Sequence, residues 1–378
     1  MRSTSGSTMR AQFVPEHDAP SVARLKGAGA LILGKTNAAE MAMDYNADNP
    51  VFGKTNNPHD LSLTTGGSSG GEAAAIAACM SAAGLGSDLA GSIRIPAHFC
   101  GIAGLKPTTG SVPSAGQFPP SIGPYSLGAA LGPMARCIDD LQLLFGVLAG
   151  TRLPTPTPVT SSLRNNRDAI RGCRVAWYTD DGIAPVTDET RRAVEQAACA
   201  LNDAGLVSEQ RRPPGLERGH DLWLKLFSRA SVVQLRDVYA GHEEEAGAFV
   251  RWRLATADDT PWMERDRLGI ALNQWMDGVP LIVAPVGATP ALKHGTHKVA
   301  VGGQTLSVFR AFSYSQAFNV FDLPSVAVPA AHSGEGLPVG VQIVGRPFEE
   351  EVVLVAAAIV EEALGGWRSP KLTCRRDV

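Results

Sequence analysis

The sequence predicts an α/β fold. Short apolar runs typical of buried strands alternate with longer segments whose apolar residues recur at helical spacing, and this alternation is the pattern of α/β proteins. Hydrophobic residues make up 44% of the 378 positions and charged residues 19%, so the chain is long and apolar enough to bury a large core. Forty glycines predict many tight turns between these elements.

The charge and the cysteine pattern exclude several classes of protein. A net charge of −3 gives no attraction to nucleic acid or to an acidic membrane surface, and no apolar run is long enough to span a bilayer. The first ten residues contain no apolar stretch that could direct secretion. The six cysteines are scattered without paired spacings, which favours free thiols in a reducing cytoplasm. We therefore expect a cytoplasmic protein with no metal, no cofactor, no nucleic-acid partner and no membrane association.

The first elements are a helix, a strand and a second helix. A helix is predicted over residues 19–29, with Asp18 as its cap, because apolar residues there mark one face. Residues 30–33 read as a short buried strand. Asn37 is expected to cap a short helix that ends at Met43.

The next stretch alternates helix and strand. Residues 71–83 are rich in alanine, which permits close packing, so this helix is placed in the interior. A short extended piece follows at 85–87, then a helix at 92–99 and a strand at 101–105. The pattern of apolar residues over 134–148 predicts an amphipathic helix.

The second half continues the alternation after a linker. Residues 153–159 (LPTPTPV) alternate prolines without a core pattern and are the best linker candidate. The remaining predicted elements are strands at 174–178, 281–284, 325–328 and 339–344, helices at 188–204, 309–318 and 349–364, and a loose tail at 365–378.

Two serines in glycine-rich turns are the strongest candidates for chemistry. Ser68 lies in a Gly-Gly-Ser-Ser-Gly-Gly turn, and Ser92 ends an Asp-Leu-Ala-Gly-Ser turn. A serine hydroxyl is a weak nucleophile, so it needs a base and a group of donors for the negative charge that develops on a carbonyl oxygen. Residues 89–92 offer successive backbone N–H groups with little side-chain bulk at the start of a helix. Ser92 is therefore a plausible nucleophile with its own oxyanion hole.

Simpler interpretations of these turns compete with this one. A Gly-Ser cluster taken alone is usually a flexible turn. Gly66-x-Ser68-x-Gly70 also matches a nucleophile elbow, but that motif needs a buried strand before it, and residues 61–65 make a poor one. A phosphate-binding loop needs a lysine after the glycines, where this chain has Glu72.

The combination of motifs resembles the amidase signature family over nearly the whole chain. GGSSGGEAAAIAA followed by GLGSDLAGSIRIPA carries most of the resemblance, which is weakest over residues 153–279. Further matching segments lie at 18–25, 34–37, 49–53, 57–58, 100–108, 318–325 and 336–342.

The resemblance implies a single large α/β domain over residues 1–364, with a mixed sheet sandwiched between helices, followed by the tail at 365–378. It also implies a Ser–cis-Ser–Lys triad. Ser92 corresponds to the nucleophile, and Ser68 to the bridging serine behind a cis peptide bond from Gly67. The oxyanion donors are then Leu89, Ala90, Gly91 and Ser92, with a methyl group at Ala90 where many members have glycine. Asp88 and Arg94 are expected to support the turn, more as a structural ion pair than as catalytic groups.

The resemblance leaves the triad lysine unassigned. It implies a lysine on a strand upstream of the segment that residues 3–7 match, so we expect this position to precede Met1 and the chain to be truncated. Lys35 and Lys106 match other family segments, where neither is the base.

The resulting hypothesis is an amidase that hydrolyses a small carboxamide to an acid and ammonia or an amine through a Ser92 acyl-enzyme. The alternatives are the A subunit of a tRNA-dependent amidotransferase and a truncated, inactive remnant. Substrate selection is expected in the variable region 153–303, and a homodimer is compatible with the sequence. Four tryptophans could line an acyl pocket, although ordinary core packing is the simpler role for each: Trp223, Trp252, Trp262 and Trp275.

Overall fold

The fold is centred on one mixed sheet of eight strands. The structure is a computed structural model that describes residues 1–149, 163–228, 238–247, 251 and 262–371. Strands β8 and β9 run parallel to each other and β8 parallel to β10, and all other neighbours in the sheet are antiparallel. In spatial order the strands are β5 (Ala83–Asp88), β7 (Ala130–Ala135), β6 (Ala103–Lys106), β13 (Ser325–His332), β14 (Pro338–Val344), β10 (Leu281–Pro285), β8 (Arg174–Trp177) and β9 (Val207–Gln210).

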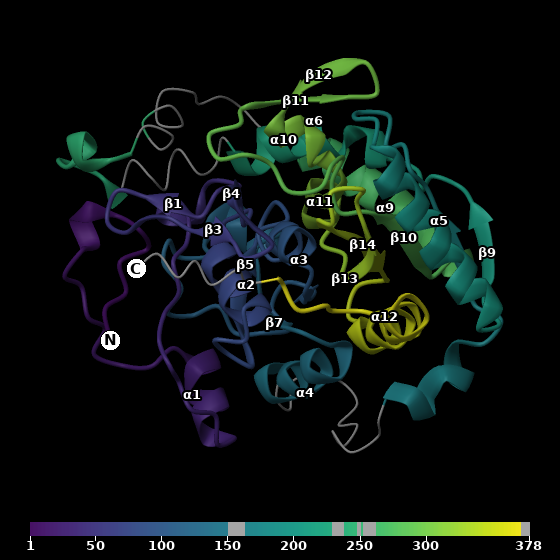
Figure 1. Ribbon diagram of the computed structural model, residues 1–378, viewed down its shortest axis with the longest axis horizontal. Coiled ribbons are helices and arrows are strands. Elements are labelled where there is room, and N and C mark those ends of the chain that lie inside the picture. The colour runs from purple at the N-terminus through teal and green to yellow at the C-terminus, as the bar shows by residue number, and fades with distance from the viewer. Residues whose placement is uncertain (150–162, 229–237, 248–250, 252–261, 372–378) are drawn as a thin grey trace.

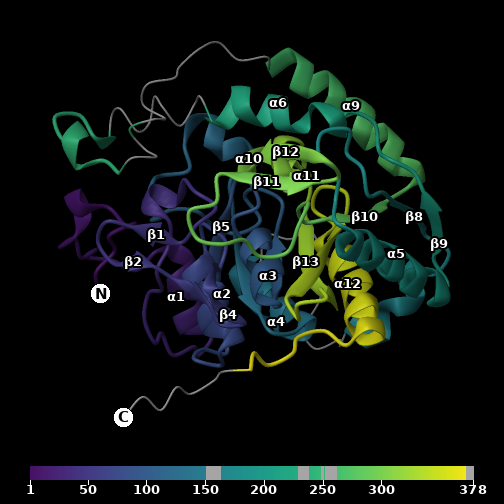
Figure 2. The ribbon, with the colours of Figure 1, turned by 45° about the horizontal axis from the view of Figure 1, so that its top comes forward.

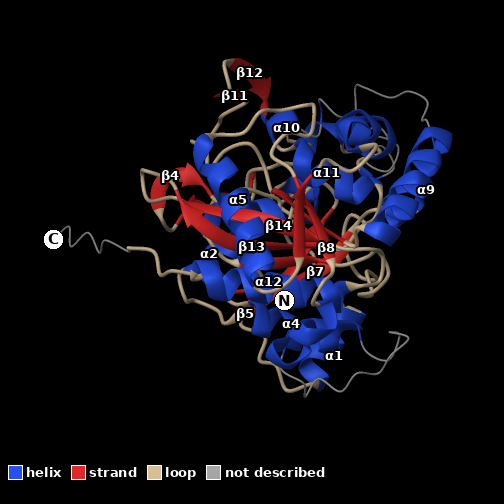
Figure 3. Cartoon of the chain, turned by 90° about the vertical axis from the view of Figure 1, so that its right-hand side faces the viewer, coloured by secondary structure: helices blue, strands red, loops and turns tan. Residues whose placement is uncertain are grey.

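Helices cover both faces of this sheet, as Figure 3 shows with the red strands enclosed by blue helices. Successive residues of β10 belong to different cores: Ile282 packs into one hydrophobic cluster and Val283 into the other. This alternation follows from the two-residue period of a strand. One core includes residues of α4 (Ile138–Ala149), α5 (Asp188–Asp203) and α12 (Glu350–Leu364). The other includes residues of α2 (Gly70–Ala77), α3 (Arg94–Cys100), α6 (Gly219–Trp223), α9 (Trp262–Gly278), α10 (Val308–Ala311) and α11 (Ser313–Val320).

Small elements surround the sheet. The N-terminal elements lie at the β5 end, whereas β8 and β9 lie at the opposite end (Figures 1 and 2). The two-stranded pairs are β1 (Asp48–Asn49) with β2 (Gly53–Lys54), β3 (Asn56–Asn57) with β4 (Asp60–Thr64), and β11 (Lys298–Val301) with β12 (Gln304–Ser307). The remaining helices are α1 (Pro20–Gly27) and the short η1 (Thr8–Arg10), η2 (Glu40–Ala42), η3 (Gly123–Leu127), η5 (Leu163–Ile170), η6 (Leu216–Arg218), η7 (Leu224–Ser228) and η8 (Glu243–Glu245).

The predicted α/β class and the mixed sheet between helices are confirmed. The predicted helix at 188–204 is α5, where the Thr187 hydroxyl accepts a hydrogen bond from the N–H of Thr190 at the first turn. The closing helix is α12, and the strand expected at 281–284 is β10. These elements were predictable because their apolar patterns are long or their caps are explicit.

The strand predicted at residues 30–33 is wrong. These residues form no regular structure, and the exposed fractions of Leu31 and Leu33 are 88% and 75%. Among the described residues, no strand pairs with this run. The edge strand of the large sheet is β5, and residues 30–33 do not extend the sheet beyond it. An apolar run becomes a strand only when a neighbour satisfies its backbone N–H and C=O groups, and that neighbour is not visible in local sequence.

Three other local predictions are corrected. Asp18 does not cap α1, which begins at Pro20; instead the Asp18 carboxylate pairs with Lys26 at 2.7 Å. Asn37 does not cap a helix, because the short helix η2 begins at Glu40 after Ala39, and the Asn37 side-chain oxygen accepts from Asn49 Nδ2 while its Nδ2 donates to the carbonyl of Gly53 at 2.8 Å. Met134 lies in β7, and α4 begins only at Ile138.

Three further predictions differ in extent or cannot be compared. Helix α2 ends at Ala77, short of the predicted Ala83, where β5 begins; between them Cys79 has a φ of +59°, which an α-helix does not allow. The region from 205 to 278, expected to be helical, also contains strand β9. The linker predicted at 153–159 lies outside the described residues.

A buried histidine, His98, connects helix α3 to two segments much later in the chain, at Thr289 and Gly340. His98, on α3, is 1% exposed; its Nδ1 accepts a hydrogen bond from the N–H of Gly340 at 2.7 Å, and its Nε2 lies 2.9 Å from the carbonyl of Thr289. Nδ1 must stay unprotonated to accept this bond, so the ring is neutral. Burial lowers the pKa of His98 to about 4.

Stability should therefore fall as the pH drops from about 6.5 to about 4. In this window the unfolded chain binds a proton on His98 that the folded chain excludes, so the stabilisation present above pH 6.5 is progressively lost, by about 3 kcal/mol from this group. Urea unfolding at a series of pH values measures the slope. His98→Gln, which keeps one donor and one acceptor, should flatten it, and an unchanged slope in that variant would contradict the assignment.

Candidate active site

The fold brings the two glycine-rich serine turns to one cavity. Ser68 precedes α2, and Ser92 lies between β5 and α3. Both line one cavity. The backbone N–H of Ser69 donates to the carbonyl of Ser92 at 3.2 Å, which ties the two turns together. Residues separated by an entire helix and strand therefore meet at one end of β5.

The first turn has the backbone conformation that the resemblance implied. The Gly67–Ser68 peptide bond is cis. A Cβ atom at Gly67 would lie 2.6 Å from the carbonyl oxygen of Asp44 and 2.7 Å from the nitrogen of Asn46. Only glycine permits this close approach of two backbone segments. The glycine before Ser68 is thus required by packing against residues 44–46.

A buried ion pair organises the second turn. Asp88 and Arg94 are 1% and 0% exposed, and Arg94 Nε and Nη2 donate to Asp88 Oδ2 at 3.0 Å and Oδ1 at 2.9 Å. Asp88 also accepts from the backbone N–H of Gly91 at 2.8 Å and of Ile93 at 3.1 Å. Burial by itself would raise the pKa of Asp88, but the charge and hydrogen bonds of Arg94 hold it at about 2. The carboxylate therefore stays ionised and closes the loop from 88 to 94.

The same turn presents unpaired backbone donors. Gly91 has a φ of +107°, a conformation that favours glycine. Its N–H is engaged by Asp88. Within the described part of the chain, the N–H groups of Leu89, Ala90 and Ser92 have no protein acceptor. Leu89 and Ser92 line the cavity, so their N–H groups are available to a ligand there, and Ala90 lies between these two residues in the turn.

No lysine of the described residues lines the serine cavity. The ammonium of Lys106 is buried and donates to the carbonyls of Pro107 and Leu323, both at 3.0 Å, and lies 3.4 Å from Asp322 Oδ1. Lys35 donates to the Ser3 hydroxyl at 2.9 Å. Neither residue lines the serine cavity. These contacts give Lys106 a structural role, because all three of its ammonium donors are occupied.

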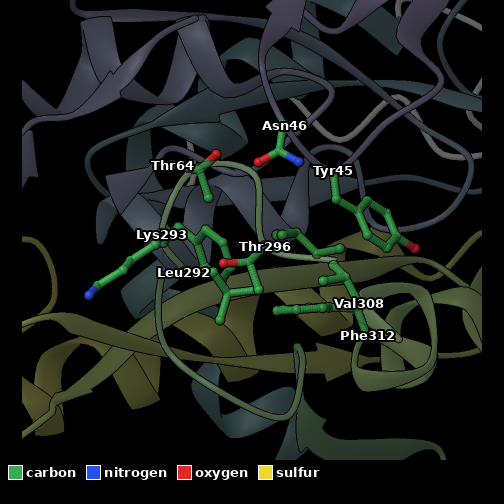
Figure 4. A pocket seen from close by; sticks show the side chains of 10 residues that line it. Tyr45, Asn46, Thr64, Leu292, Lys293, Thr296, Val308 and Phe312 are labelled. Atoms are coloured by element: carbon green, nitrogen blue, oxygen red, sulfur yellow. The ribbon is translucent and has the colours of Figure 1, made fainter. Parts of the chain in front are cut away.

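A second, smaller cavity contains neither serine. It is lined mainly by apolar side chains and includes Lys293, whose amino group points away from the other labelled residues (Figure 4). Tyr45 forms one wall of this cavity. This pocket contains neither glycine-rich serine turn, so the serine cavity is the better candidate for chemistry.

Sequence reasoning missed several residues around the turn. Apart from Ser87, Ser121, Gln117 and the serine turns, the described cavity wall consists of apolar or aromatic residues, and these are Met41, Ala42, Met43, Pro119, Pro120, Tyr125 and Ala129. Tyr45, Trp223 and Asn319 hold the carbonyl side of the turn. The sequence indicated Trp223 only as a possible pocket residue and Asn319 only as part of the matching segment 318–325, and it did not single out Tyr45. No local signal could have grouped the three around one turn.

Neither a metal centre nor a membrane span is found in the part of the chain that the structure describes. It contains no group of three or more His, Cys, Asp or Glu side chains able to hold a metal ion. None of its helices is both long and apolar enough to cross a bilayer.

Comparisons with known proteins agree on one family. A sequence model of the Amidase family matches residues 1–354. Fatty-acid amide hydrolase 2 of Homo sapiens is 30% identical over 404 residues, covering 98% of this chain and 74% of the relative. The A subunit of the glutamyl-tRNA(Gln) amidotransferase of Trichlorobacter lovleyi is 31% identical over 415 residues, covering 98% and 82%.

Solved structures give the same result. A crystal structure of an amidase superposes with a TM-score of 0.84 at 28% identity, covering 97% of this chain and 82% of that one. The structure of 6-aminohexanoate cyclic dimer hydrolase superposes with a TM-score of 0.82 at 26% identity, covering 98% and 83%. Sequence and structure therefore place this chain in the amidase signature family.

Proposed function

We propose that this chain is an amidase that cleaves a carboxamide C–N bond through an acyl-enzyme on Ser92. The observation that carries the proposal is the convergence of Ser92, Ser68 and unpaired backbone N–H groups on one cavity. A nucleophile beside preorganised donors is the arrangement that acyl transfer requires.

The proposed reaction has two steps. Ser92 Oγ bonds to the carbonyl carbon and gives its proton to Ser68, which passes its own hydroxyl proton to a base that the family resemblance implies is a neutral lysine. The carbonyl oxygen becomes negative against the N–H groups of Leu89, Ala90 and Ser92. The C–N bond then breaks, the nitrogen takes the proton returned through Ser68, and the acyl group stays on Ser92. Water repeats the attack and releases the acid. We assign no described lysine as the base that Ser68 needs, since none lines the cavity.

The cavity wall supports a neutral, largely apolar acyl group. Of the described residues that line it, only Asp88 carries a charge, and Arg94 neutralises that charge. A charged group on the substrate would lose its hydration without gaining a partner, which is costly. An amino-acid amide carries an ammonium and a carboxylate group, and the described part of this wall offers neither of them a partner. The cavity therefore argues against an amidotransferase that takes its ammonia from an amino-acid amide.

A matched pair of substrates tests this proposal. Hexanamide and 6-aminohexanamide have the same chain length and differ by a terminal ammonium group. We expect kcat/KM to favour hexanamide by about tenfold or more, equivalent to about 1.4 kcal/mol. Ammonia release measures both rates, with glutamine as a further comparison. Preference for either charged amide would contradict the substrate class, and absence of ammonia release from every amide would contradict the activity of this chain.

A further inference from the structure

The carbonyl side of the Ser92 turn is held by three side chains from distant parts of the sequence. Asn319 Nδ2 donates to the carbonyl of Asp88 at 3.2 Å, and Trp223 Nε1 donates to the carbonyl of Leu89 at 2.8 Å. The Tyr45 hydroxyl donates to the carbonyl of Ala90 at 2.8 Å. Three successive peptide groups of the turn are thus each fixed from one side.

Fixing these carbonyls also fixes the direction of the N–H groups. In a planar trans peptide, the C=O of one residue and the N–H of the next point in opposite directions. The bond from Trp223 to the carbonyl of Leu89 therefore directs the N–H of Ala90 away from the indole. This N–H has no acceptor among the described residues, and the neighbouring Leu89 and Ser92 line the cavity.

The three peptide groups differ in how firmly their N–H groups are held. The N–H of Gly91, opposite the Tyr45 contact, is also held by the Asp88 carboxylate at 2.8 Å. The N–H of Ala90 has no such second restraint. The orientation of Ala90 therefore depends on Trp223 more than that of Gly91 depends on Tyr45.

An aromatic stack keeps Trp223 in place. The Phe309 ring lies 5.9 Å from that of Trp223 with an interplanar angle of 20°, and 4.8 Å from that of Tyr45. Gln316 Nε2 donates to the Tyr45 hydroxyl at 2.9 Å and to the carbonyl of Phe309 at 2.8 Å. Trp223 is 3% exposed at the end of α6. Packing therefore holds the Trp223 side chain in one orientation before a substrate binds.

Burial of a tryptophan in this chain does not by itself provide an indole hydrogen bond. Trp275 has a buried Nε1 without a hydrogen-bond partner in the described structure. The contact from Trp223 to Leu89 is therefore a specific feature of its position. Any aromatic residue could fill the space that Trp223 occupies, but only a side chain with a ring N–H can make this hydrogen bond to the turn.

We propose that Trp223 is a positioning residue that aims the N–H of Ala90 at the developing oxyanion. The inference rests on the proposed amidase function, and it assigns a role to a residue of the region that the sequence left as substrate-selecting. It acts through the Leu89–Ala90 peptide group and not by contact with the substrate.

The test compares Trp223→Phe with Trp275→Phe. Both changes remove an indole N–H and keep an aromatic ring, but only the first removes a hydrogen bond to the turn. Loss of a complete oxyanion donor typically slows an enzyme by about a hundred- to a thousandfold, and loss of its alignment should cost about tenfold. We expect Trp223→Phe to lower the rate of fluorophosphonate labelling and kcat by about tenfold with KM unchanged, and Tyr45→Phe to lower them less.

A second readout does not depend on activity. The sequence contains the Leu–Ala dipeptide at 89–90, 148–149 and 254–255. Protein labelled with ¹³C at leucine carbonyls and ¹⁵N at alanine therefore gives amide signals selective for these pairs. Signals that disappear on Leu89→Ile identify Ala90. We expect its signal to move in Trp223→Phe and to stay in place in Trp275→Phe, with unfolding midpoints confirming that both variants are folded.

The outcomes separate the two proposals. An unmoved Ala90 signal in Trp223→Phe, or a moved signal with a labelling rate like that of Trp275→Phe, overturns the role of Trp223. A wild-type chain that never labels contradicts the amidase proposal instead, and the Ala90 signal then decides whether Trp223 orients the peptide group.

Discussion

Replacing Ser92 with alanine should abolish covalent labelling by a fluorophosphonate and reduce amide hydrolysis to background. Without its hydroxyl, the cavity retains donors for an oxyanion but no group that can form an acyl-enzyme. Loss of a catalytic serine lowers kcat by roughly a millionfold in a well-studied serine hydrolase, so the expected loss here exceeds the range of most assays. Intact-protein mass spectrometry measures the adduct, and peptide mapping locates it.

Two further serine variants show whether the loss of labelling is specific to Ser92. Ser208→Ala, on β9 at the opposite end of the sheet, should label as the wild type does. Ser68→Ala should fold and label slowly, because Ser92 then lacks its proton partner. Labelling that persists in Ser92→Ala would contradict the assignment of the nucleophile.

Replacing Asp88 with asparagine should destabilise the folded chain by about 3–5 kcal/mol. The change keeps the size of the side chain but leaves the Arg94 guanidinium charged and buried without its partner, which is the costly way to break a buried ion pair. It also weakens the bonds that hold the N–H groups of Gly91 and Ile93. Urea unfolding at pH 7 measures the loss.

An exposed ion pair provides the control for Asp88→Asn. Glu209→Gln breaks the contact between Arg174 and Glu209, whose side chains are 49% and 32% exposed, and should cost less than about 1 kcal/mol. The pH dependence is a further check. Because the folded pKa of Asp88 is about 2, below the ordinary value near 3.9, its stabilisation is complete above about pH 4 and is lost as the pH falls through 2. Equal losses in Asp88→Asn and Glu209→Gln would contradict the structural role of the buried pair.

Local sequence was most informative where a single segment carries its own physical constraint. The turns around Ser68 and Ser92 combine glycines, small side chains and helix starts, so their shape follows from the residues they contain. Asp88 and Arg94 were predictable as a pair because both belong to the same turn. Residues 30–33 show the opposite case, since an apolar run cannot reveal whether a neighbouring strand exists.

The sequence by itself determined the α/β class, the two serine turns and the family. Only the tertiary structure decided which donors of the second turn are unpaired, because the Asp88 carboxylate occupies the N–H of Gly91, whereas those of Leu89, Ala90 and Ser92 have no acceptor among the described residues. It also grouped Tyr45, Trp223 and Asn319 around three successive carbonyls. The physical reason is that a peptide group is oriented by whatever contacts its carbonyl. Those contacts come from side chains far away in the sequence, which no local pattern connects.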